Sequence, residues 1–151
     1  MIIIKSYTDL EQSKRLAEIL PIESSDMCWT NHYYGRMRSS MTISAKSIYE
    51  YKKLLERFAD STSIDVFYPA WSLAALMSVL RVFTIPTAFS VKVSTPSLIK
   101  TENGYKLTYI GDYTPMINNG LDIETPIESV ADNPIDACVN MIIKLKEGGL
   151  L

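Results

Sequence analysis

A cysteine and the only histidine of the chain, Cys28 and His32, lie four residues apart. On a β-strand this spacing puts both side chains on one face, and a thiol near an imidazole can act as a nucleophile with its base. Two pairs of residues separate them along the strand, so they would touch only if the strand bends. A buried thiol and an ordinary histidine are the simpler interpretation. The sequence therefore assigns no catalytic residue.

Metal binding has little support in the residues present. With one histidine and two cysteines, a zinc site would need carboxylates to complete it. Four acidic residues could bind a cation, but their spacing is not that of an EF-hand, and a solvated acidic loop explains them as well. They are Asp112, Asp122, Glu124 and Glu128. The sequence also lacks a glycine-rich phosphate loop and the GxSxG and HExxH motifs. We expect no metal ion and no cofactor, and we expect a protein that is not an enzyme.

The segment WTNHYYGRMR, residues 29–38, combines aromatic rings with arginines. Single-stranded nucleic acids are bound by this combination, because rings stack on bases and guanidinium groups hold phosphates. The candidate contact residues are Trp29, His32, Tyr33, Tyr34, Arg36 and Arg38. On a strand half of the rings must point inward, so a sheet with a core face and a basic turn is the alternative interpretation.

Charge is distributed unevenly along the chain, although the net charge is only −2. Residues 29–57 hold six basic and two acidic side chains, a balance of +4, whereas residues 102–136 hold seven acidic side chains against Lys106, a balance of −6. The acidic total confines any nucleic-acid binding to a local patch. We expect the two oppositely charged segments to face each other, within one molecule or between two.

Length and composition predict one ordinary globular domain over residues 1–151. Hydrophobic residues make up 47% and charged residues 21%, which is typical of a folded chain rather than a disordered one. Two cysteines are too few for a disulfide framework, and the apolar run of MIIIKSYTDLEQ is too short for a signal peptide. These features predict a cytoplasmic protein with reduced thiols.

The most apolar stretch is residues 66–83, VFYPAWSLAALMSVLRVF, and the remaining elements should cover it. Pro69 favours an extended backbone before it, and Ser72 can cap a helix that begins at Leu73 and runs to Phe83. A helix that is apolar nearly all round must be buried on several sides or lie in an oligomer interface. The uncharged run from Val66 to Leu80 is too short to span a bilayer, so we expect no membrane insertion.

Three further helices are predicted. The sequence Thr8-Asp-Leu-Glu11 matches a capping box before a helix over Asp9–Leu20. Ser44 is a suitable N-cap for a helix over Ala45–Ala59. In the last helix Asp132 or Asn133 caps, Pro134 occupies the first position, and the body runs to Glu147 before two glycines.

Strands are expected from β-branched and aromatic runs bounded by turn residues. The predicted strands are Ile2–Lys5, Met27–Tyr34, Ile64–Tyr68, Ala88–Val93, Ser97–Lys100 and Tyr105–Ile110, with residues 36–42 either a connection or a further short strand. Asn103-Gly104 indicates a hairpin between the last two, so the last three should form an antiparallel meander. Residues 112–132 have no sustained period and should be one long irregular loop.

A resemblance to a known family rests on three segments: EQSKRLAEIL (11–20), YPAWSLAALMSVL (68–80) and DNPIDACVNMIIKLKE (132–147). They resemble a family of small uncharacterised proteins carried by phages and other mobile elements of gut bacteria. The resemblance covers about a quarter of the chain, and it implies a biological context but no catalytic residue.

Taken together, the sequence predicts an α+β domain with about four helices packed against a mainly antiparallel sheet. The expected function is a non-enzymatic accessory or protein-interaction domain that associates with itself or with a protein partner. The grounds for self-association are the apolar helix at 73–83, the wide apolar stripe over 135–145 and the opposed charges. The alternative is a nucleic-acid-binding module that uses the stretch from Trp29 to Arg38.

Overall fold

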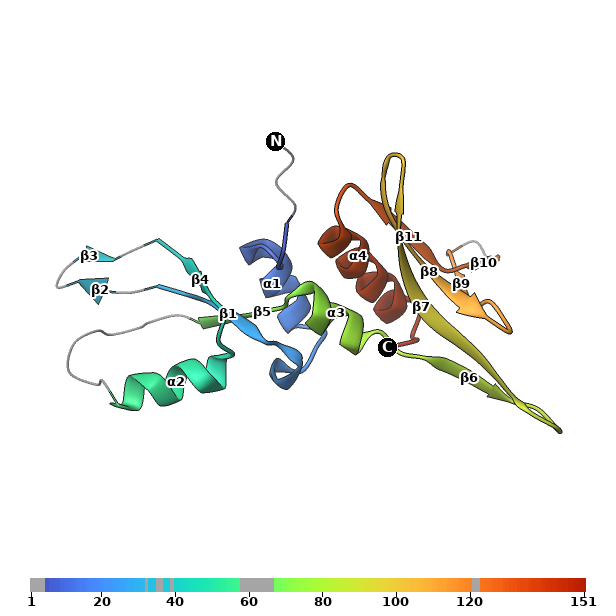
Figure 1. The fold of residues 1–151 in the computed structure, drawn as a ribbon, viewed down its shortest axis with the longest axis horizontal. Helices are drawn as coiled ribbons and strands as arrows, with labels where there is room; N and C mark the ends of the chain where they lie inside the picture. The colour runs from blue at the N-terminus through green and yellow to red at the C-terminus, as the bar shows by residue number, and fades with distance from the viewer. Residues whose placement is uncertain (1–4, 32, 35–36, 39, 58–66, 121–122) are drawn as a thin grey trace. The chain divides into compact units, whose positions relative to one another are not determined.

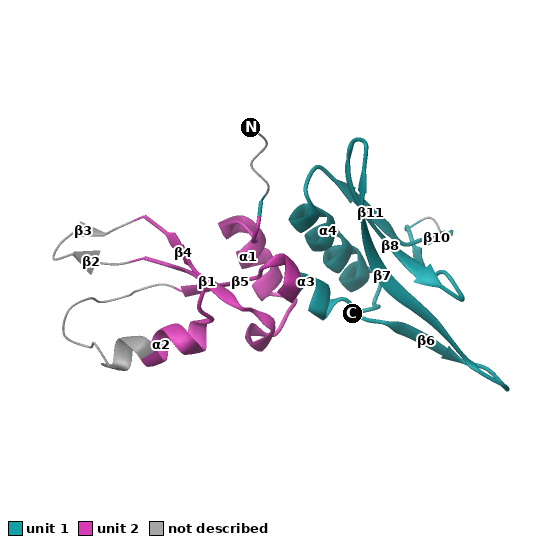
Figure 2. Cartoon of the chain, viewed as in Figure 1, with its two compact units in different colours: residues 1–5, 76–151 teal, residues 6–75 magenta. Residues whose placement is uncertain are grey.

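The computed structural model describes residues 5–31, 33–34, 37–38, 40–57, 67–120 and 123–151. Of residues 33–34, 37–38 and 54–57 it describes the backbone alone. The chain divides into two compact units, residues 6–75 and residues 1–5 with 76–151, which have different colours in Figure 2. Each unit is described here by itself, and a single domain over the whole chain stays a prediction.

The described part of the chain contains four α-helices and several small sheets (Figure 1). Every strand pair found in those sheets is antiparallel. The predicted α+β fold class is therefore confirmed. The predicted strand at Ile2–Lys5 lies outside the described residues, apart from Lys5 itself.

A three-stranded sheet organises residues 6–75, with β1 (Met27–Thr30) between β4 (Thr42–Ser44) and β5 (Phe67–Ala70). Side chains alternate along β1, so that Cys28 and Thr30 are buried while Met27 and Trp29 are half-buried. Asn31 is buried too, which breaks the alternation. The predicted strand Met27–Tyr34 is not continuous, because β1 ends at Thr30 and Tyr33–Tyr34 belong to a separate strand.

Helix α1 (Leu10–Ala17) is shorter than the predicted Asp9–Leu20, and its capping box lies one residue further on. Asp9 Oδ1 accepts a hydrogen bond from Gln12 N at 2.8 Å, and Gln12 Oε1 accepts one from Asp9 N at 3.2 Å. The predicted box of Thr8 and Glu11 is wrong because the Thr8 hydroxyl is used in the core. A 3-10 turn, η1 (Ile22–Ser24), follows the helix.

Thr8 and Trp71 form the buried polar centre of this unit. Thr8 N donates to Trp71 O at 3.0 Å, and Trp71 N donates to Thr8 Oγ1 at 3.1 Å. The same Thr8 hydroxyl lies 2.8 Å from Ser13 Oγ, and the Trp71 indole donates to Ser24 Oγ at 2.9 Å. These bonds join α1, η1 and the end of β5, and they satisfy polar groups that would be costly to bury alone.

Helix α2 (Ile48–Arg57) begins three residues later than the predicted Ala45, and its cap differs. Glu50 N donates to Ser47 Oγ at 3.3 Å, while Ser47 N donates to Glu50 Oε2 at 3.0 Å. This reciprocal pair is a capping box, so the predicted N-cap at Ser44 is wrong. Ser44 instead ends β4. The end of the predicted helix at Ala59 lies outside the described residues.

Helix α3 (Leu73–Val79) begins where the sequence predicts but ends four residues before Phe83. Ser72 Oγ accepts from Ala75 N at 3.2 Å, which confirms the cap, and Asp26 accepts from Ser72 N at 2.8 Å. Leu76 is fully buried. The helix ends early because the β-rich run from Phe83 joins a sheet. Within the described residues, no helix is long and apolar enough to cross a membrane.

The second unit is built on a four-stranded sheet in the order β11-β8-β7-β6. Its strands are β6 (Phe83–Pro86), β7 (Val91–Thr101), β8 (Gly104–Gly111) and β11 (Glu128–Ala131). The predicted meander is confirmed only for its last hairpin, β7 with β8. The two strands predicted at Ala88–Val93 and Ser97–Lys100 are wrong as separate strands, because both fall on β7, and β6 is a strand that was not predicted.

The turn between β7 and β8 is the hairpin that Asn103-Gly104 predicts. Thr101 pairs with Gly104, which leaves Glu102 and Asn103 as a two-residue loop. Gly104 has a φ of 142°, a conformation that side-chain-bearing residues rarely adopt.

Residues 112–132 contain more structure than the predicted irregular loop. A small hairpin of β9 (Met116–Asn118) and β10 (Glu124–Pro126) lies there, followed by β11 of the large sheet. The prediction failed because strands of three or four residues are too short to display a period.

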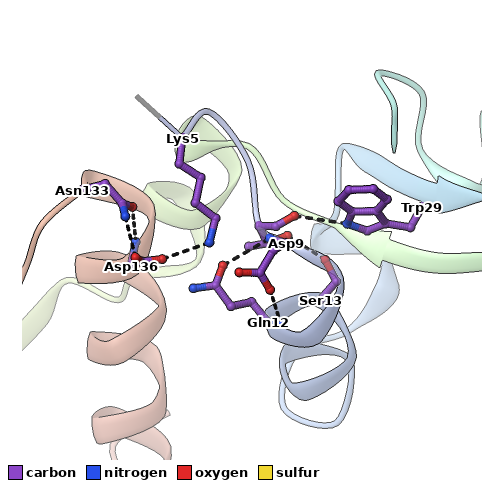
Figure 3. A network of polar contacts seen from close by, with 8 residues as sticks. Lys5, Asp9, Gln12, Ser13, Trp29, Asn133 and Asp136 are labelled. Atoms are coloured by element: carbon purple, nitrogen blue, oxygen red, sulfur yellow. Dashed lines mark hydrogen bonds and ion pairs between the residues drawn. The ribbon is translucent and has the colours of Figure 1, made fainter. Parts of the chain in front are cut away.

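Helix α4 (Pro134–Glu147) has the boundaries that the sequence predicts. Asn133 Oδ1 accepts from Asp136 N at 2.9 Å, which makes Asn133 the N-cap. Figure 3 shows the Asp136 carboxylate also accepting from Lys5 Nζ at 3.1 Å. The helix packs on β8 and β11. Its buried residues form the core of this unit: Ile135, Ala137, Cys138, Val139, Met141, Ile142 and Leu145.

Candidate interaction surface

Trp29 of the predicted nucleic-acid stretch is engaged inside its own unit. Its indole N–H donates to Thr8 O at 3.1 Å, as Figure 3 shows. The ring also meets the edge of the Tyr7 ring, with centroids 5.9 Å apart and planes at 72°. A stacking platform for bases needs an open ring face. Trp29 is half-buried, so only part of its ring surface is open to solvent.

Further along this stretch, the two short strands β2 (Tyr33–Tyr34) and β3 (Met37–Arg38) are described. Backbone pairing places Tyr33 opposite Arg38 and Tyr34 opposite Met37. His32 and Arg36 lie outside the described residues.

Both cysteines are free and buried. Burial raises the pKa of the Cys28 thiol to about 11 and that of the Cys138 thiol to about 12. The nucleophilic form of cysteine is the thiolate, which is scarce near neutral pH at such pKa values. Cys138 Sγ contacts Met77 Sδ at 3.6 Å. The pairing of Cys28 with His32 lies outside what the structure describes, because His32 does.

The acidic residues of 112–132 have separate roles. Asp112 Oδ2 accepts from Val93 N at 3.3 Å, and Glu128 forms an ion pair with Lys106 at 2.8 Å. Glu124 is exposed on β10, and Asp122 is outside the described residues. In the described part of the chain, no three His, Cys, Asp or Glu side chains are grouped so that they could hold a metal ion.

The four-stranded sheet has a face turned away from α4, which we call the outer face. Residues at paired positions share a face, so strand register assigns the side chains. Ser129, Leu107 and Leu98 form a row on the α4 side. The neighbouring row of Val130, Lys106 and Ile99 is then on the outer face. The same alternation adds Ile110, Thr95, Val93 and Val91 to it.

Apolar side chains on the outer face remain open to solvent. Val130 is 59% exposed, Ile99 47% and Ile110 55%. The ion pair of Lys106 and Glu128 lies among them, and the Lys106 ammonium lowers the pKa of the Glu128 carboxyl. Scattered exposed apolar residues are ordinary, but neighbouring ones on a sheet face indicate a contact surface.

A hairpin arm, residues 84–92, continues β6 and β7 beyond the end of β8, as Figure 1 shows. Its strands pair through Ile85–Lys92 and Pro86–Val91. Thr87 N donates to Ser90 O at 2.7 Å, and Ser90 N donates to Thr87 Oγ1 at 3.0 Å, which closes the turn. All nine residues of the arm are exposed. Phe89 at the tip is 101% exposed.

The turn of the arm is made of Ala88 and Phe89, which turn geometry does not favour. Two-residue hairpin loops prefer glycine, asparagine and aspartate. The other hairpin of this sheet has the two-residue loop Glu102-Asn103, in which Asn103 is one of the preferred residues. The arm was not predicted from the sequence, because the predicted strand begins at Ala88, within the turn of the arm. The signal was present in Thr87-Ala-Phe-Ser90, which separates two β-branched runs.

The open strand edges of this sheet are protected. Lys144 Nζ donates to the Glu128 carbonyl of edge strand β11 at 2.6 Å. Edge strand β6 ends in Pro86, which has no N–H to offer. In the described pairings β6 reaches only as far as Ser94 of β7, and Pro96 lies just beyond. Lysine and proline are common means of preventing strand addition. The outer face is thus a better contact surface than the edges.

No family model, no curated protein and no solved structure matches the chain.

Proposed function

We propose that the chain is a non-enzymatic interaction domain that associates with a second copy of itself through the outer face. The observation that carries the proposal is the row of Val130, Lys106 and Ile99, whose apolar members are about half exposed. Burying such β-branched side chains would contribute about 25 cal/mol per Å² of apolar area removed from water. Two sheets stack well face to face, as in β-sandwiches.

A second copy is the partner that the charges fit. A two-fold interface brings the same surface of each copy together, so it must be self-complementary. The outer face holds one cation and one anion side by side, Lys106 and Glu128. A two-fold axis can place the Lys106 of one copy near the Glu128 of the other.

Part of the surface that the sequence offered for self-association is used within the chain. The wide stripe of α4 is buried, and α4 packs on β8 and β11. Leu76 of α3 is buried as well. We therefore still expect a homo-oligomer, but the outer face of the sheet supports this expectation instead of the helices. Binding of nucleic acid through Trp29–Arg38 stays a prediction, and the internal contacts of Trp29 give it no further support.

The cellular setting is part of the proposal. Two free, buried cysteines suit a reducing compartment, so we place the protein in the cytoplasm. The resemblance to small proteins of phages and mobile elements of gut bacteria supplies the biological context.

The double variant Ile99→Lys, Val130→Lys tests the proposal. It puts two charges beside Lys106 on the outer face, where a dimer would bring six lysines together. We expect the wild-type chain to sediment as a dimer at tens of micromolar and the variant as a monomer. Circular dichroism checks that the fold is kept, since lysine at exposed strand positions costs up to about 1 kcal/mol each.

Ile22→Lys is the matched control, because Ile22 is similarly exposed but lies in η1 of the other unit. It should leave the dimer intact. A wild-type monomer, or a dimer that survives the double variant, would contradict the proposal.

A further inference from the structure

The outer face alone is too small for a stable dimer. Three strands spaced about 4.8 Å apart and eight residues long, at about 3.3 Å per residue, cover roughly 400 Å² per copy. Stable interfaces bury about 800 Å² per partner, and smaller ones resemble crystal contacts. The proposed association therefore needs further surface, and the arm provides it.

The length of β7 determines where the arm would go. This strand runs from Val91 in the arm to Thr101 at the Glu102-Asn103 turn. If two outer faces stack about a two-fold axis near the middle of β7, each arm lies over the opposite end of the other copy's strand. That end carries Ile99 and Val130, both about half exposed.

We propose, on the basis of the proposed function, that each arm binds the Ile99–Val130 end of the second copy and places Phe89 over its Glu102-Asn103 turn. A phenylalanine buries about 150–250 Å² and covers a similar area of its partner. Two arms then raise the total to roughly 1,600 Å², the size of a standard interface. This accounts for an exposed aromatic residue in a turn where small polar residues are preferred.

Charge complementarity supports a second copy as the occupant. The arm carries Lys92 and no acidic residue, so its net charge is positive, although Lys92 pairs with Ile85 at a position on the α4 side of the strand. The receiving end carries Glu102 and Asp132, both exposed. They lie at the same end of the sheet, because a Cβ added to Gly104 would be 3.3 Å from Asp132 Cα. Lys100 pairs with Tyr105 and so belongs to the α4 side. The positively charged arm and the negatively charged end of the second copy should therefore attract each other, even in moderate salt.

Intermolecular cross-linking tests this geometry directly. Ala88→Cys and Asn103→Cys each place a thiol at an exposed turn, and the native cysteines are buried. A mixture of the two variants under oxidising conditions should form the 88–103 disulfide between copies. Each variant alone should cross-link about tenfold more slowly or worse, because two identical positions lie at opposite ends of the dimer and a disulfide needs Cα atoms within about 7 Å.

A binding measurement completes the test. Phe89→Ser should raise the dimer dissociation constant about tenfold or more, as expected for a central aromatic anchor. Val82→Ser is the control, because Val82 is also exposed but precedes the arm. A wild-type monomer would overturn both proposals. A wild-type dimer that neither prefers the mixed cross-link nor weakens with Phe89→Ser would overturn the arm contact and leave the outer face as the interface.

Discussion

Three buried titratable groups have raised pKa values, so the free energy of unfolding should fall as the pH becomes alkaline. Cys28 and Cys138 have folded-state pKa values of about 11 and 12 against an ordinary 9.0. Burial likewise raises the pKa of Tyr109 from 10.0 to about 12. Between the ordinary and the raised value, the folded chain binds more protons than the unfolded chain. Stability from these groups is therefore complete below pH 9 and is lost as pH rises through 11 to 12.

We expect the free energy of unfolding in urea to be lower at pH 10.5 than at pH 8. The double variant Cys28→Ala, Cys138→Ala should show a smaller decline between these two pH values, because only Tyr109 among the three groups remains. An unchanged decline in this variant would mean that the thiols titrate normally in the folded chain.

Single residues were the hardest part of the site to predict. Trp29 has the chemistry of a base-stacking residue, and its sequence gives no sign that Thr8, 21 residues earlier, takes its indole N–H. Phe89 was overlooked for the opposite reason, since a lone phenylalanine in an apolar segment looks like a core residue. Both errors arise because the partners of a side chain are set by tertiary structure.

At the scale of elements, competing caps decided where helices begin. Both Ser44 and Ser47 precede α2, and both are good N-cap residues. Ser47 is selected because Glu50 stands three residues after it and completes the reciprocal pair. In α4 both Asp132 and Asn133 were possible caps, but Pro134 favours the first helical position, so the start of the helix could be predicted.

Ser47→Ala should therefore lower the free energy of unfolding by about 0.5–2 kcal/mol. Ser44→Ala should have a smaller effect, because Ser44 Oγ accepts only from the exposed Lys46 N, at 3.3 Å. Urea unfolding followed by circular dichroism measures both. Equal losses, or a larger loss for Ser44→Ala, would be evidence that the helix begins earlier.

Strands were predicted in type but not in extent. The β7–β8 hairpin was predictable because Asn103-Gly104 is a local turn signal, but its register was not, since the loop is Glu102-Asn103 and Gly104 pairs with Thr101. The extent of β7 was not, since Pro96 looks like an interruption. It is tolerated because β6 has already ended at that point of the sheet. Strand extent thus depends on a neighbour that lies elsewhere in the sequence.

At the scale of the whole molecule, α3 contributes to both compact units. Its first three residues belong to the unit of residues 6–75, and the others from Leu76 belong to the second unit. If one unit unfolds, α3 loses the residues that this unit contributes, and the remaining part of the helix in the other unit is incomplete. The predicted single domain can be tested through this shared element.

We expect calorimetry to record one unfolding transition whose calorimetric and van't Hoff enthalpies agree. Two resolved transitions, or a calorimetric enthalpy well above the van't Hoff value, would mean that the units unfold independently. The measurement should be made on dilute protein, because the proposed dimerisation would shift the apparent midpoint with concentration.

Gly111, at the base of the arm, has a consequence for the kinetics of the proposed assembly. A Cβ there would overlap the Val93 carbonyl oxygen, which accepts from Asp112 N at 2.9 Å. Asp112 returns the contact by accepting from Val93 N. These two hydrogen bonds restrain the direction of the hairpin before two copies meet. An arm held in one direction would lose little conformational entropy on binding a second copy. Collisions in the right orientation could then lead to binding without a search through alternative arm positions.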